Sequence, residues 1–359
     1  MALLTVPRDA VLDPARLRRV FRRALEGFER DAPVLLMGHH DADGLGALAL
    51  LTRAFRAAGR EVLTRIVGRG ENPWSAEMAA ELAPLRIGGL IAADLAVRPG
   101  PIRAGTPAIL LDHHVPMGAS PHAVVISGYG MTPVPTSSLL AFWCAAELAQ
   151  VDAWLWIAAL GIVGDMADDA GFAEMALARS RYGIGVLREA TALINAARRS
   201  SSADAGPALA LLLKAEGPRD IVSGRYPETQ ALLAARDEVK RELERARRTA
   251  PVVRDGVALL LFHSPCQVHP LVAQAWRTRL SKAVVIAANT GYRAGWVHFA
   301  ARTALEVNLI EFLARHAPPG ADEQYGSGHE RATGGALRIP DWNAFAAGLG
   351  FGPEAQVRA

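Results

Sequence analysis

The chain has 359 residues, which is enough for two domains of ordinary size. Its composition, 51% hydrophobic and 21% charged, is typical of a folded globular protein and excludes an intrinsically disordered chain. The net charge of +3 permits a nucleotide partner without requiring one.

Neither a disulfide framework nor a membrane segment is expected. Cys144 and Cys266 lie in different halves of the chain and outside any CxxC pair, which argues against structural disulfides and zinc knuckles. The N-terminus lacks the features of a signal peptide, and no apolar run reaches the ~18 residues that a transmembrane helix needs. We therefore expect a cytoplasmic protein with no membrane partner, either a monomer or a homodimer.

The first part of the chain predicts an α/β domain. Short apolar runs, typical of buried parallel strands, alternate with helical stretches from residue 14 onward. We expect helices at 14–30, 47–58, 136–149 and 153–162, strands at 33–37, 61–67, 87–93, 108–111 and 123–126, and a loop at 38–46. This alternation favours a mostly parallel sheet flanked by helices.

A charge-dense, helix-prone segment at residues 229–248 separates this part from a second set of elements. We interpret the segment as a solvated linker helix rather than a nucleic-acid contact. After it we expect strands at 257–262, 283–288 and 296–301 and helices at 271–280 and 307–315. The predicted organisation is a first domain at 1–225, a linker helix at 226–251 and a smaller α/β domain at 252–359.

Asp and His residues gather at four places, three of which directly follow predicted strands. The four groups are Gly38-His39-His40-Asp41-Ala42-Asp43-Gly44, Asp94, Asp112-His113-His114 and Asp165. Taken alone, some have an ordinary explanation: Asp-x-Asp-Gly also occurs in calcium loops, and a single Asp after a strand often caps a helix. Because the carboxyl ends of parallel strands meet at one edge of a sheet, we expect the groups to converge.

Mixed Asp and His side chains indicate a metal site. Imidazole suits divalent transition metals, and a neighbouring carboxylate can orient its ring. The combination favours manganese, with magnesium, iron or cobalt as other candidates, over calcium. Two such ions about 3.5–4 Å apart would activate a hydroxide for in-line attack on phosphorus. The sequence therefore predicts a two-metal hydrolytic site.

The order of these motifs resembles that of the DHH phosphoesterase superfamily. The matching residues are His39-x-Asp41-x-Asp43-Gly44, Asp94, Asp112-His113-His114 and Gly161-Ile-Val-Gly-Asp165. The second part of the chain resembles the DHH-associated (DHHA1) domain, whose signature is a glycine-rich loop around a His. The residues that fit this signature are Gly326-Ser327-Gly328-His329 and, upstream, Arg302-Thr303. The first motif resembles the RecJ-like branch more closely than the nanoRNase and pAp-phosphatase branch.

The resemblance implies a role for each of these residues. The implied metal ligands are His39, Asp41, Asp43, Asp94, His113 and Asp165. His114 is implied as a contact to the scissile phosphate and Asp112 as a residue that orients a histidine, while the role of His40 stays open. The implied substrate-phosphate site in the second domain comprises Arg302, Gly326, Ser327, Gly328 and His329, which combine an arginine fork with backbone N–H groups.

The implied activity is the hydrolysis of phosphodiester bonds in single-stranded nucleic acid or short oligonucleotides, with two Mn²⁺ ions as cofactors. Two alternatives would use the same site, namely a pAp phosphatase and a cyclic-dinucleotide phosphodiesterase. A third alternative is a catalytically dead scaffold protein. A dead domain should have lost metal ligands, and all of those implied are present here. The preference for RNA or DNA and the polarity of cleavage are left open.

Overall fold

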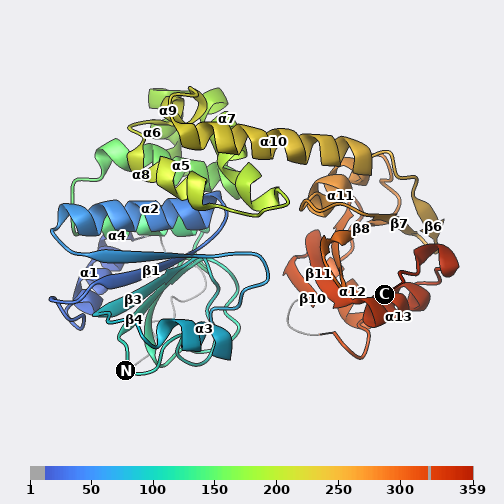
Figure 1. Ribbon diagram of the computed structural model, residues 1–359, viewed down its shortest axis with the longest axis horizontal. Helices are drawn as coiled ribbons and strands as arrows, with labels where there is room; N and C mark the ends of the chain where they lie inside the picture. The colour runs from blue at the N-terminus through green and yellow to red at the C-terminus, as the bar shows by residue number, and fades with distance from the viewer. Residues whose placement is uncertain (1–12, 322–324, 359) are drawn as a thin grey trace. The chain divides into compact units, whose positions relative to one another are not determined.

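The computed structural model describes residues 13–321 and 325–358, with only the backbone described at 327–329. The chain divides into two compact units. The N-terminal unit comprises Met1–Arg198 and Ala203–Leu233, and the C-terminal unit comprises Arg199–Ser202 and Ala234–Ala359. The division falls inside helix α10 (Pro227–Ala246), within the segment predicted as a linker helix. Each unit is an α/β structure built on one sheet, as predicted (Figure 1).

The sheet of the N-terminal unit has five parallel strands in the order β2-β1-β3-β4-β5. The strands are β1 (Val34–His39), β2 (Val62–Val67), β3 (Gly89–Ala93), β4 (Ala108–Asp112) and β5 (Ala123–Ser127). The predicted parallel sheet is therefore confirmed. The strand order reverses between β1 and β3, and open α/β sheets bind their ligands at such a switch point.

Alternate residues of each strand face opposite sides of this sheet. In β1, Val34 and Leu36 belong to the large core formed with the helices α1, α2, α4 and α5, whereas Leu35 and Met37 pack with α3. The helices are α1 (Pro14–Leu25), α2 (Ala42–Ala57), α3 (Ala76–Leu82), α4 (Ser137–Ala145), α5 (Leu155–Gly164), α6 (Ala173–Tyr182), α7 (Ile184–Arg199), α8 (Gly206–Lys214) and α9 (Pro218–Val222). A 3₁₀ turn at Asp152–Trp154 precedes α5.

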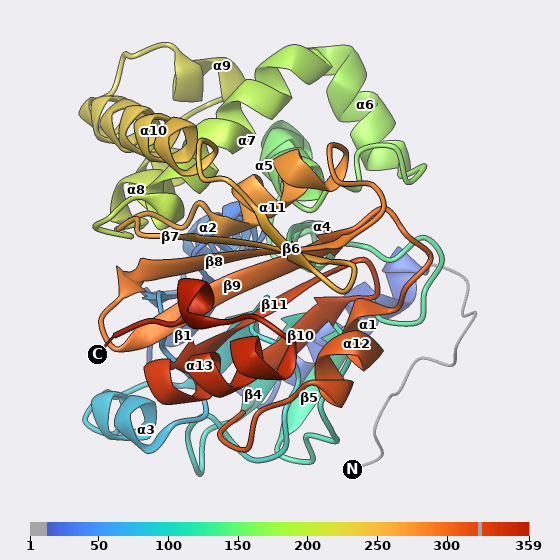
Figure 2. The same ribbon diagram turned by 90° about the vertical axis from the view of Figure 1, so that its right-hand side faces the viewer.

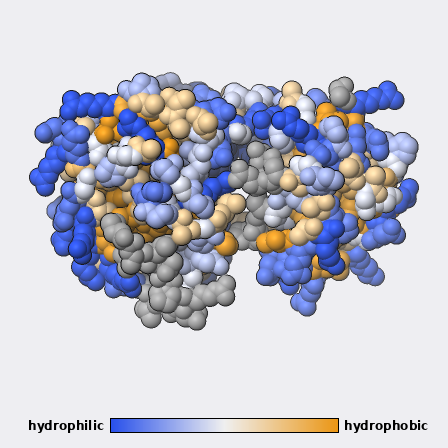
Figure 3. All heavy atoms as spheres, turned by 90° about the horizontal axis from the view of Figure 1, so that it is seen from below, coloured by the Kyte–Doolittle hydropathy of each residue, from blue (hydrophilic) through white to orange (hydrophobic). Residues whose placement is uncertain are grey.

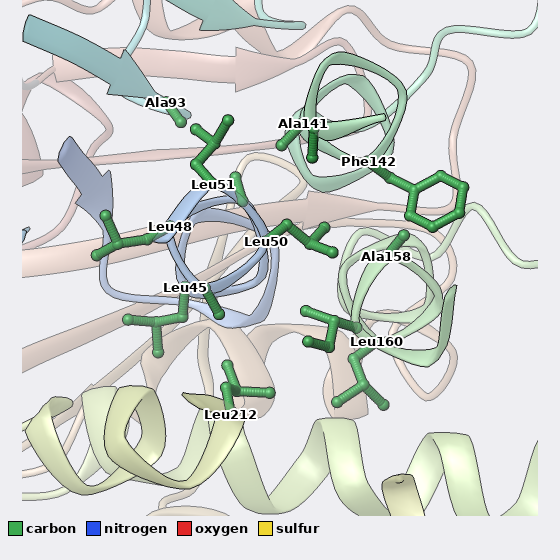
Figure 4. Close-up of a cluster of buried hydrophobic side chains, with 14 of the residues drawn as sticks. Leu45, Leu48, Leu50, Leu51, Ala93, Ala141, Phe142, Ala158, Leu160 and Leu212 are labelled. Atoms are coloured by element: carbon green, nitrogen blue, oxygen red, sulfur yellow. The ribbon is translucent and has the colours of Figure 1, made fainter. Parts of the chain in front are cut away.

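Helix α2 lies at the centre of the large core. Figure 4 shows leucines of α2 among Ala141 and Phe142 of α4, Ala158 and Leu160 of α5 and Leu212 of α8. Leu45, Leu48 and Leu50 are fully buried, and burying each such side chain contributes roughly 1.5–3 kcal/mol. This packing places the N-terminus of α2 rigidly beside the end of β1.

The start of α2 corrects one prediction. We expected a loop over residues 38–46, but the helix begins at Ala42. Asp41 is the N-cap, and its Oδ1 accepts a hydrogen bond from the Gly44 N–H at 3.0 Å. A Cβ atom at Gly44 would lie 2.6 Å from atoms of His39. Gly44 is therefore needed for the close approach of α2 to β1 and not for a turn.

The sheet of the C-terminal unit has six strands in the order β10-β11-β9-β8-β7-β6 (Figure 2). Strands β7 and β8 are parallel, and the other pairs are antiparallel. The strands are β6 (Val252–Arg254), β7 (Val257–Phe262), β8 (Val284–Arg293), β9 (Trp296–Thr303), β10 (Tyr325–His329) and β11 (Ala332–Arg338). Helices α11 (His269–Arg277), α12 (Leu309–Arg315) and α13 (Ile339–Gly348) and a 3₁₀ turn at Pro353–Ala355 complete the unit.

The glycine-rich segment at residues 326–335 corrects a second prediction. We expected a loop, but the segment forms the antiparallel hairpin of β10 and β11, in which Gly328 pairs with Thr333. Strand β11 also pairs with β9, opposite Ala300 and Arg302. Small residues therefore let neighbouring strands approach each other closely, and a Cβ atom at Gly334 would lie 2.4 Å from the Phe299 carbonyl oxygen.

Both units keep most of their large apolar side chains inside. The face drawn in Figure 3 is largely hydrophilic, with hydrophobic residues in smaller groups between. Cys144 and Cys266 are both buried, and neither forms a disulfide within the described part of the chain. Among the described residues, no helix is both long and apolar enough to cross a membrane.

Candidate metal centre

The Asp and His groups of the N-terminal unit lie together at the carboxyl edge of its sheet. His39 ends β1, Asp41 and Asp43 begin α2, Asp94 follows β3, His113 and His114 follow β4, and Asp165 follows α5. Three trios have ligand atoms within 4.8 Å of one another: His39–Asp41–Asp94, Asp43–His113–Asp165 and Asp94–His113–His114. The tertiary structure therefore brings together all six residues that the resemblance implied as metal ligands.

Asp94 belongs to two of the trios, the one with His39 and Asp41 and the one with His113 and His114. Its Oδ2 is 3.6 Å from His39 Nδ1, and its Oδ1 is 3.5 Å from His113 Nε2. The Ser137 hydroxyl donates to Oδ1 at 3.1 Å. The backbone of Asp94 has φ +63°, a region that residues other than glycine seldom adopt. The two oxygens of this carboxylate thus face two different histidines, which is the arrangement that a carboxylate bridging two ions needs.

The first trio contains an ion pair between His39 and Asp41. His39 Nδ1 lies 3.0 Å from Asp41 Oδ2. Burial acts against the charged imidazole, but the charge of Asp41 and hydrogen bonds to Asp41 and Asp94 outweigh it and raise the pKa of His39 to about 10. Burial also acts against the Asp41 carboxylate, but His39 and Arg198 hold the pKa of Asp41 well below its usual value.

Asp43 is fully buried and held by the N-terminus of α4. The backbone N–H groups of Ser137 and Ser138 donate to its two oxygens at 2.7 Å and 2.9 Å. Burial, followed by the charge of Asp94, raises the pKa of Asp43 to about 6. Two N–H groups at a helix N-terminus thus fix the carboxylate in place, and its remaining lone pairs are free for a cation.

The second trio places His113 between carboxylates. His113 Nε2 is 3.3 Å from Asp165 Oδ2 and 3.9 Å from Asp43 Oδ2. Burial opposes the charged ring, but the hydrogen bond to Asp94 and the charge of Asp43 raise the pKa of His113 to about 10. Burial and the charges of Asp43 and Asp94 raise the pKa of Asp165 well above its usual value. The cluster therefore holds more negative charge than its histidines neutralise, which favours divalent cations.

Asp112 and His114 form a separate pair at the edge of the cluster. Asp112 is buried, and its Oδ1 accepts hydrogen bonds from the backbone N–H of His114 at 2.7 Å and from His114 Nδ1 at 3.2 Å. Its Oδ2 accepts from the Ala96 N–H at 2.8 Å. The His114 side chain is 49% exposed. Asp112 therefore fixes the orientation of the half-exposed His114 ring.

The residues implied as a phosphate site in the C-terminal unit lie on β9 and β10, with β11 between these two strands in the sheet. Arg302 is in β9, and its Nη1 donates to the carbonyl oxygens of Ala301 at 2.9 Å and Thr333 at 3.1 Å. Gly326 has φ +76° at the start of β10. Ser327, Gly328 and His329 follow in β10, and their side chains lie outside the described part of the chain.

Arg302 lies in a region of positive charge. Burial, followed by the charge of Arg277 in α11, lowers the pKa of Arg302. His269, the first residue of α11, is buried, and burial together with His298 and Arg302 holds its pKa well below the usual value. Arg277 and Arg302 are thus two neighbouring positive groups, which favour the binding of an anion.

Comparisons with known proteins were made by sequence and by structure. No protein-family model and no curated protein matches the chain. RecJ from Thermus thermophilus in complex with Mn²⁺ is 20% identical, with a TM-score of 0.65 over 96% of this chain and 55% of RecJ. A manganese-bound exonuclease RecJ is also 20% identical, with a TM-score of 0.65 over 97% of this chain and 95% of its own. The DHH domain of a protein described as a member of a ribosomal-protein family has a TM-score of 0.62 at 14% identity, over 93% and 89%.

The chain has the fold of RecJ. It spans about half the length of the Thermus thermophilus enzyme and nearly the whole of the second RecJ structure. The predicted fold class, a DHH unit followed by a smaller α/β unit, is confirmed by this match.

His40, whose role the motif left open, points away from the trios. Its Nδ1 donates to the Val67 carbonyl oxygen at 2.9 Å, at the end of β2. Burial and the charge of His39 lower the pKa of His40 to about 4, so the ring is neutral at neutral pH. His40 therefore anchors the β1–α2 connection to β2 and belongs to none of the three trios.

Sequence reasoning missed four residues that support the cluster, namely Ser137, Ser138, Asn195 and Arg198. The two serines follow Thr136, the N-cap of α4, and a Thr-Ser-Ser helix start is a signal that could have indicated N–H groups free to bind an anion. Asn195 lies in the apolar run of α7 and is buried, so a lone polar residue in that run was the available signal. Nothing in the sequence pattern singles out Arg198.

Proposed function

We propose that the chain is a metal-dependent phosphoesterase that hydrolyses phosphodiester bonds in single-stranded nucleic acid or short oligonucleotides. The observation that carries this proposal is the position of Asp94, whose two oxygens face His39 and His113 in separate trios. Mixed Asp and His donors fit manganese, with magnesium or cobalt as substitutes. The proposal is also supported by the shared fold of the manganese-bound exonuclease RecJ.

In this proposal, His39 and Asp41 would hold one ion, Asp43, His113 and Asp165 would hold the other, and Asp94 would be a ligand common to both. Two bound ions would lower the pKa of water and polarise a phosphoryl oxygen. The N–H groups of Ser137 and Ser138 fix Asp43, so this carboxylate needs no rearrangement when an ion binds. The protein thus supplies a preorganised acidic site at a strand-order switch point.

The remaining residues would bind the substrate. Asp112 accepts a hydrogen bond from His114 Nδ1, so His114 Nε2 would donate to an oxygen of the scissile phosphate when the ring is charged. Burial opposes the charged ring, but the hydrogen bond to Asp112 and the charges of Asp112 and Asp94 outweigh it and raise the pKa of His114. In the C-terminal unit, Arg302 and the backbone N–H groups of residues 326–329 would bind a second phosphate. This role is supported by the positive charge of Arg277, which lies close enough to lower the pKa of Arg302.

We expect the purified protein to release mononucleotides from short oligonucleotides when Mn²⁺ is present and to lose this activity with EDTA. The test is a panel of two- to five-nucleotide RNA and DNA, long single-stranded DNA, pAp and cyclic dinucleotides. Substitution Arg302→Gln should raise KM for oligonucleotides because it removes a fork that binds phosphate. The length dependence of turnover distinguishes short-oligonucleotide from long-strand action.

Other outcomes of the panel would overturn parts of this proposal. Turnover of pAp or a cyclic dinucleotide alone would replace the oligonucleotide substrate with a small nucleotide. Tight Mn²⁺ binding without any turnover would contradict the phosphodiester substrate class. Absence of both metal binding and turnover would favour a scaffold protein with a dead site.

Binding of Mn²⁺ should release at least about two protons at pH 7, one each from His39 and His113. His39 and His113 have pKa values raised to about 10, so both rings are charged at pH 7 without metal, whereas a metal ligand must be neutral. Metal affinity should therefore rise as the pH increases through neutrality. Isothermal titration calorimetry in buffers of different ionisation enthalpy measures the proton count.

His113→Gln should lower the proton count by about one, because one charged ring is removed. The matched control is His263→Gln, which replaces an exposed histidine of the C-terminal unit and should leave the count unchanged. A binding heat independent of the buffer would show that the two histidines are not the groups displaced by the metal.

A further inference from the structure

Arg198 brings a positive charge to the edge of the aspartate cluster. Its Nη1 lies 3.7 Å from Oδ2 of Asp41. Among the Arg and Lys side chains that the structure describes, Arg198 alone lies within 4.0 Å of Asp41, Asp43, Asp94 or Asp165. The residue is in the last turn of α7, more than 150 positions along the chain from Asp41.

Asn195 holds the guanidinium from the other side. Arg198 Nε donates to Asn195 Oδ1 at 3.2 Å, and the same oxygen accepts from the N–H of Ala42, the first residue of α2, at 3.1 Å. Asn195 is 5% exposed. One buried amide thus ties the end of α7 to the turn of α2 that carries Asp41 and Asp43.

The contacts of the Arg198 guanidinium with described residues leave some of its N–H groups without an acceptor. Five N–H groups form the planar fork of arginine, and the contacts of Arg198 engage its Nε and Nη1. Within the described part of the chain, Nη2 has no acceptor. The side chain is 18% exposed, so its free edge is open to a ligand. A rigid fork with free N–H groups is suited to a phosphate oxygen.

The charge balance of the proposed metal site also favours a positive group beside Asp41. Two divalent ions would balance the four carboxylates of Asp41, Asp43, Asp94 and Asp165. An attacking hydroxide and a phosphodiester would then add two negative charges in a partly buried site, where a fixed positive group stabilises developing charge most effectively. Arg198 supplies such a group without moving, because Asn195 already holds it.

We infer that Arg198 binds a non-bridging oxygen of the substrate phosphate next to the metal site, with Asn195 as its positioning residue. This inference rests on the proposed function, since it names a contact to the substrate of that same site. It also explains why a buried Asn interrupts the apolar run of α7.

The variants that test it are Arg198→Gln, Arg198→Lys and the matched control Arg188→Gln. Arg188 lies in the same helix, is 58% exposed and pairs with Asp168 at 2.6 Å, so its loss removes an arginine from α7 without touching the cluster. Arg198→Lys keeps a positive charge but not the fork, and it guards against a Gln variant that folds poorly.

Three measurements are made on each variant: kcat/KM for an oligonucleotide, Mn²⁺ affinity by calorimetry, and broadening of the ³¹P signal of inorganic phosphate by the Mn²⁺-loaded protein. Mn²⁺ is paramagnetic and broadens the signal of a phosphate bound close to it, so this readout needs no turnover. For Arg198→Gln we expect kcat/KM to fall about 10- to 100-fold and the broadening to weaken, while Mn²⁺ affinity stays nearly unchanged. Arg198→Lys should lose less, and Arg188→Gln should match the wild type.

Two results would overturn the inference. A fall in Mn²⁺ affinity as large as the fall in kcat/KM would show that Arg198 serves Asp41 rather than the phosphate. Equal kcat/KM and broadening for Arg198→Gln and Arg188→Gln would show that Arg198 contacts no substrate. A wild-type protein that broadens phosphate but hydrolyses no oligonucleotide would instead overturn the proposed function, and the broadening of the variants would still decide the role of Arg198.

Discussion

Substitution Asp43→Asn should abolish metal-dependent hydrolysis while leaving the fold intact. The amide lacks the negative charge that a divalent ion needs, and its NH₂ group cannot accept from the N–H of Ser137 or Ser138. Loss of a residue that hydrogen-bonds a metal ligand typically lowers metal affinity or activity roughly 10- to 100-fold. Loss of the ligand itself should lower them by more than this. Turnover, Mn²⁺ affinity and circular dichroism together measure the effect.

The matched control is Asp169→Asn. Asp169 lies four residues after Asp165 but is 77% exposed and pairs with Arg179, so its charge is solvated and distant from the trios. This variant should retain wild-type turnover and Mn²⁺ affinity. The contradicting result would be an Asp43→Asn variant that keeps more than about a tenth of the wild-type activity, a loss smaller than that expected for a residue that only hydrogen-bonds a metal ligand. That result would show that Asp43 is not a metal ligand.

Substitution Gly161→Ala should destabilise the N-terminal unit and weaken Mn²⁺ binding. A Cβ atom at Gly161 would lie 2.0 Å from Ser138 Oγ and 2.5 Å from Asp43 Oδ1. Overpacking of a tight interior typically costs about 1–3 kcal/mol in the free energy of unfolding. The displaced carboxylate would also leave the position set by the N–H groups of α4. Thermal unfolding and Mn²⁺ titration measure the two effects.

Gly185→Ala provides the comparison, because Gly185 is also in a helix but has no atom within 4 Å of an added Cβ. Alanine is the better helix former by up to about 1 kcal/mol, so this variant should be as stable as the wild type or slightly more stable. A Gly161→Ala protein with unchanged stability and Mn²⁺ affinity would mean that α5 can shift away from Asp43.

The amino-acid pattern was enough to predict the parallel sheet and the meeting of the metal-site groups. In β1, alternate apolar residues reach the two different cores, and this continuous apolar run is what a strand buried on both faces requires. Parallel strands end at the same edge, so Asp94 and His113 had to lie near His39 once the strands were identified. The order of the motifs added the likeness to the DHH superfamily, which the fold of RecJ supports.

The predictions based on local propensity were wrong at two places where backbone segments approach each other closely. Three glycines made residues 38–46 look like a loop. Gly44 is needed because His39 leaves no room for a side chain inside the first turn of α2. The glycine-rich segment at 326–335 looked like a loop for the same reason and is a hairpin paired with β9. In both cases tertiary contact overrides the preference of glycine for irregular backbone.

The sequence by itself determined which Asp and His residues form the cluster and which strand ends present them, because periodicity and strand-end position are local properties. Only the tertiary structure decided what holds those residues. Ser137 and Ser138 reach Asp43 from 94 and 95 positions away, and Asn195 reaches Ala42 from 153. Contacts across such separations depend on how helices pack against the sheet, and no short-range pattern encodes that packing. The supporting residues of the cluster, Arg198 among them, could therefore be found only in the folded chain.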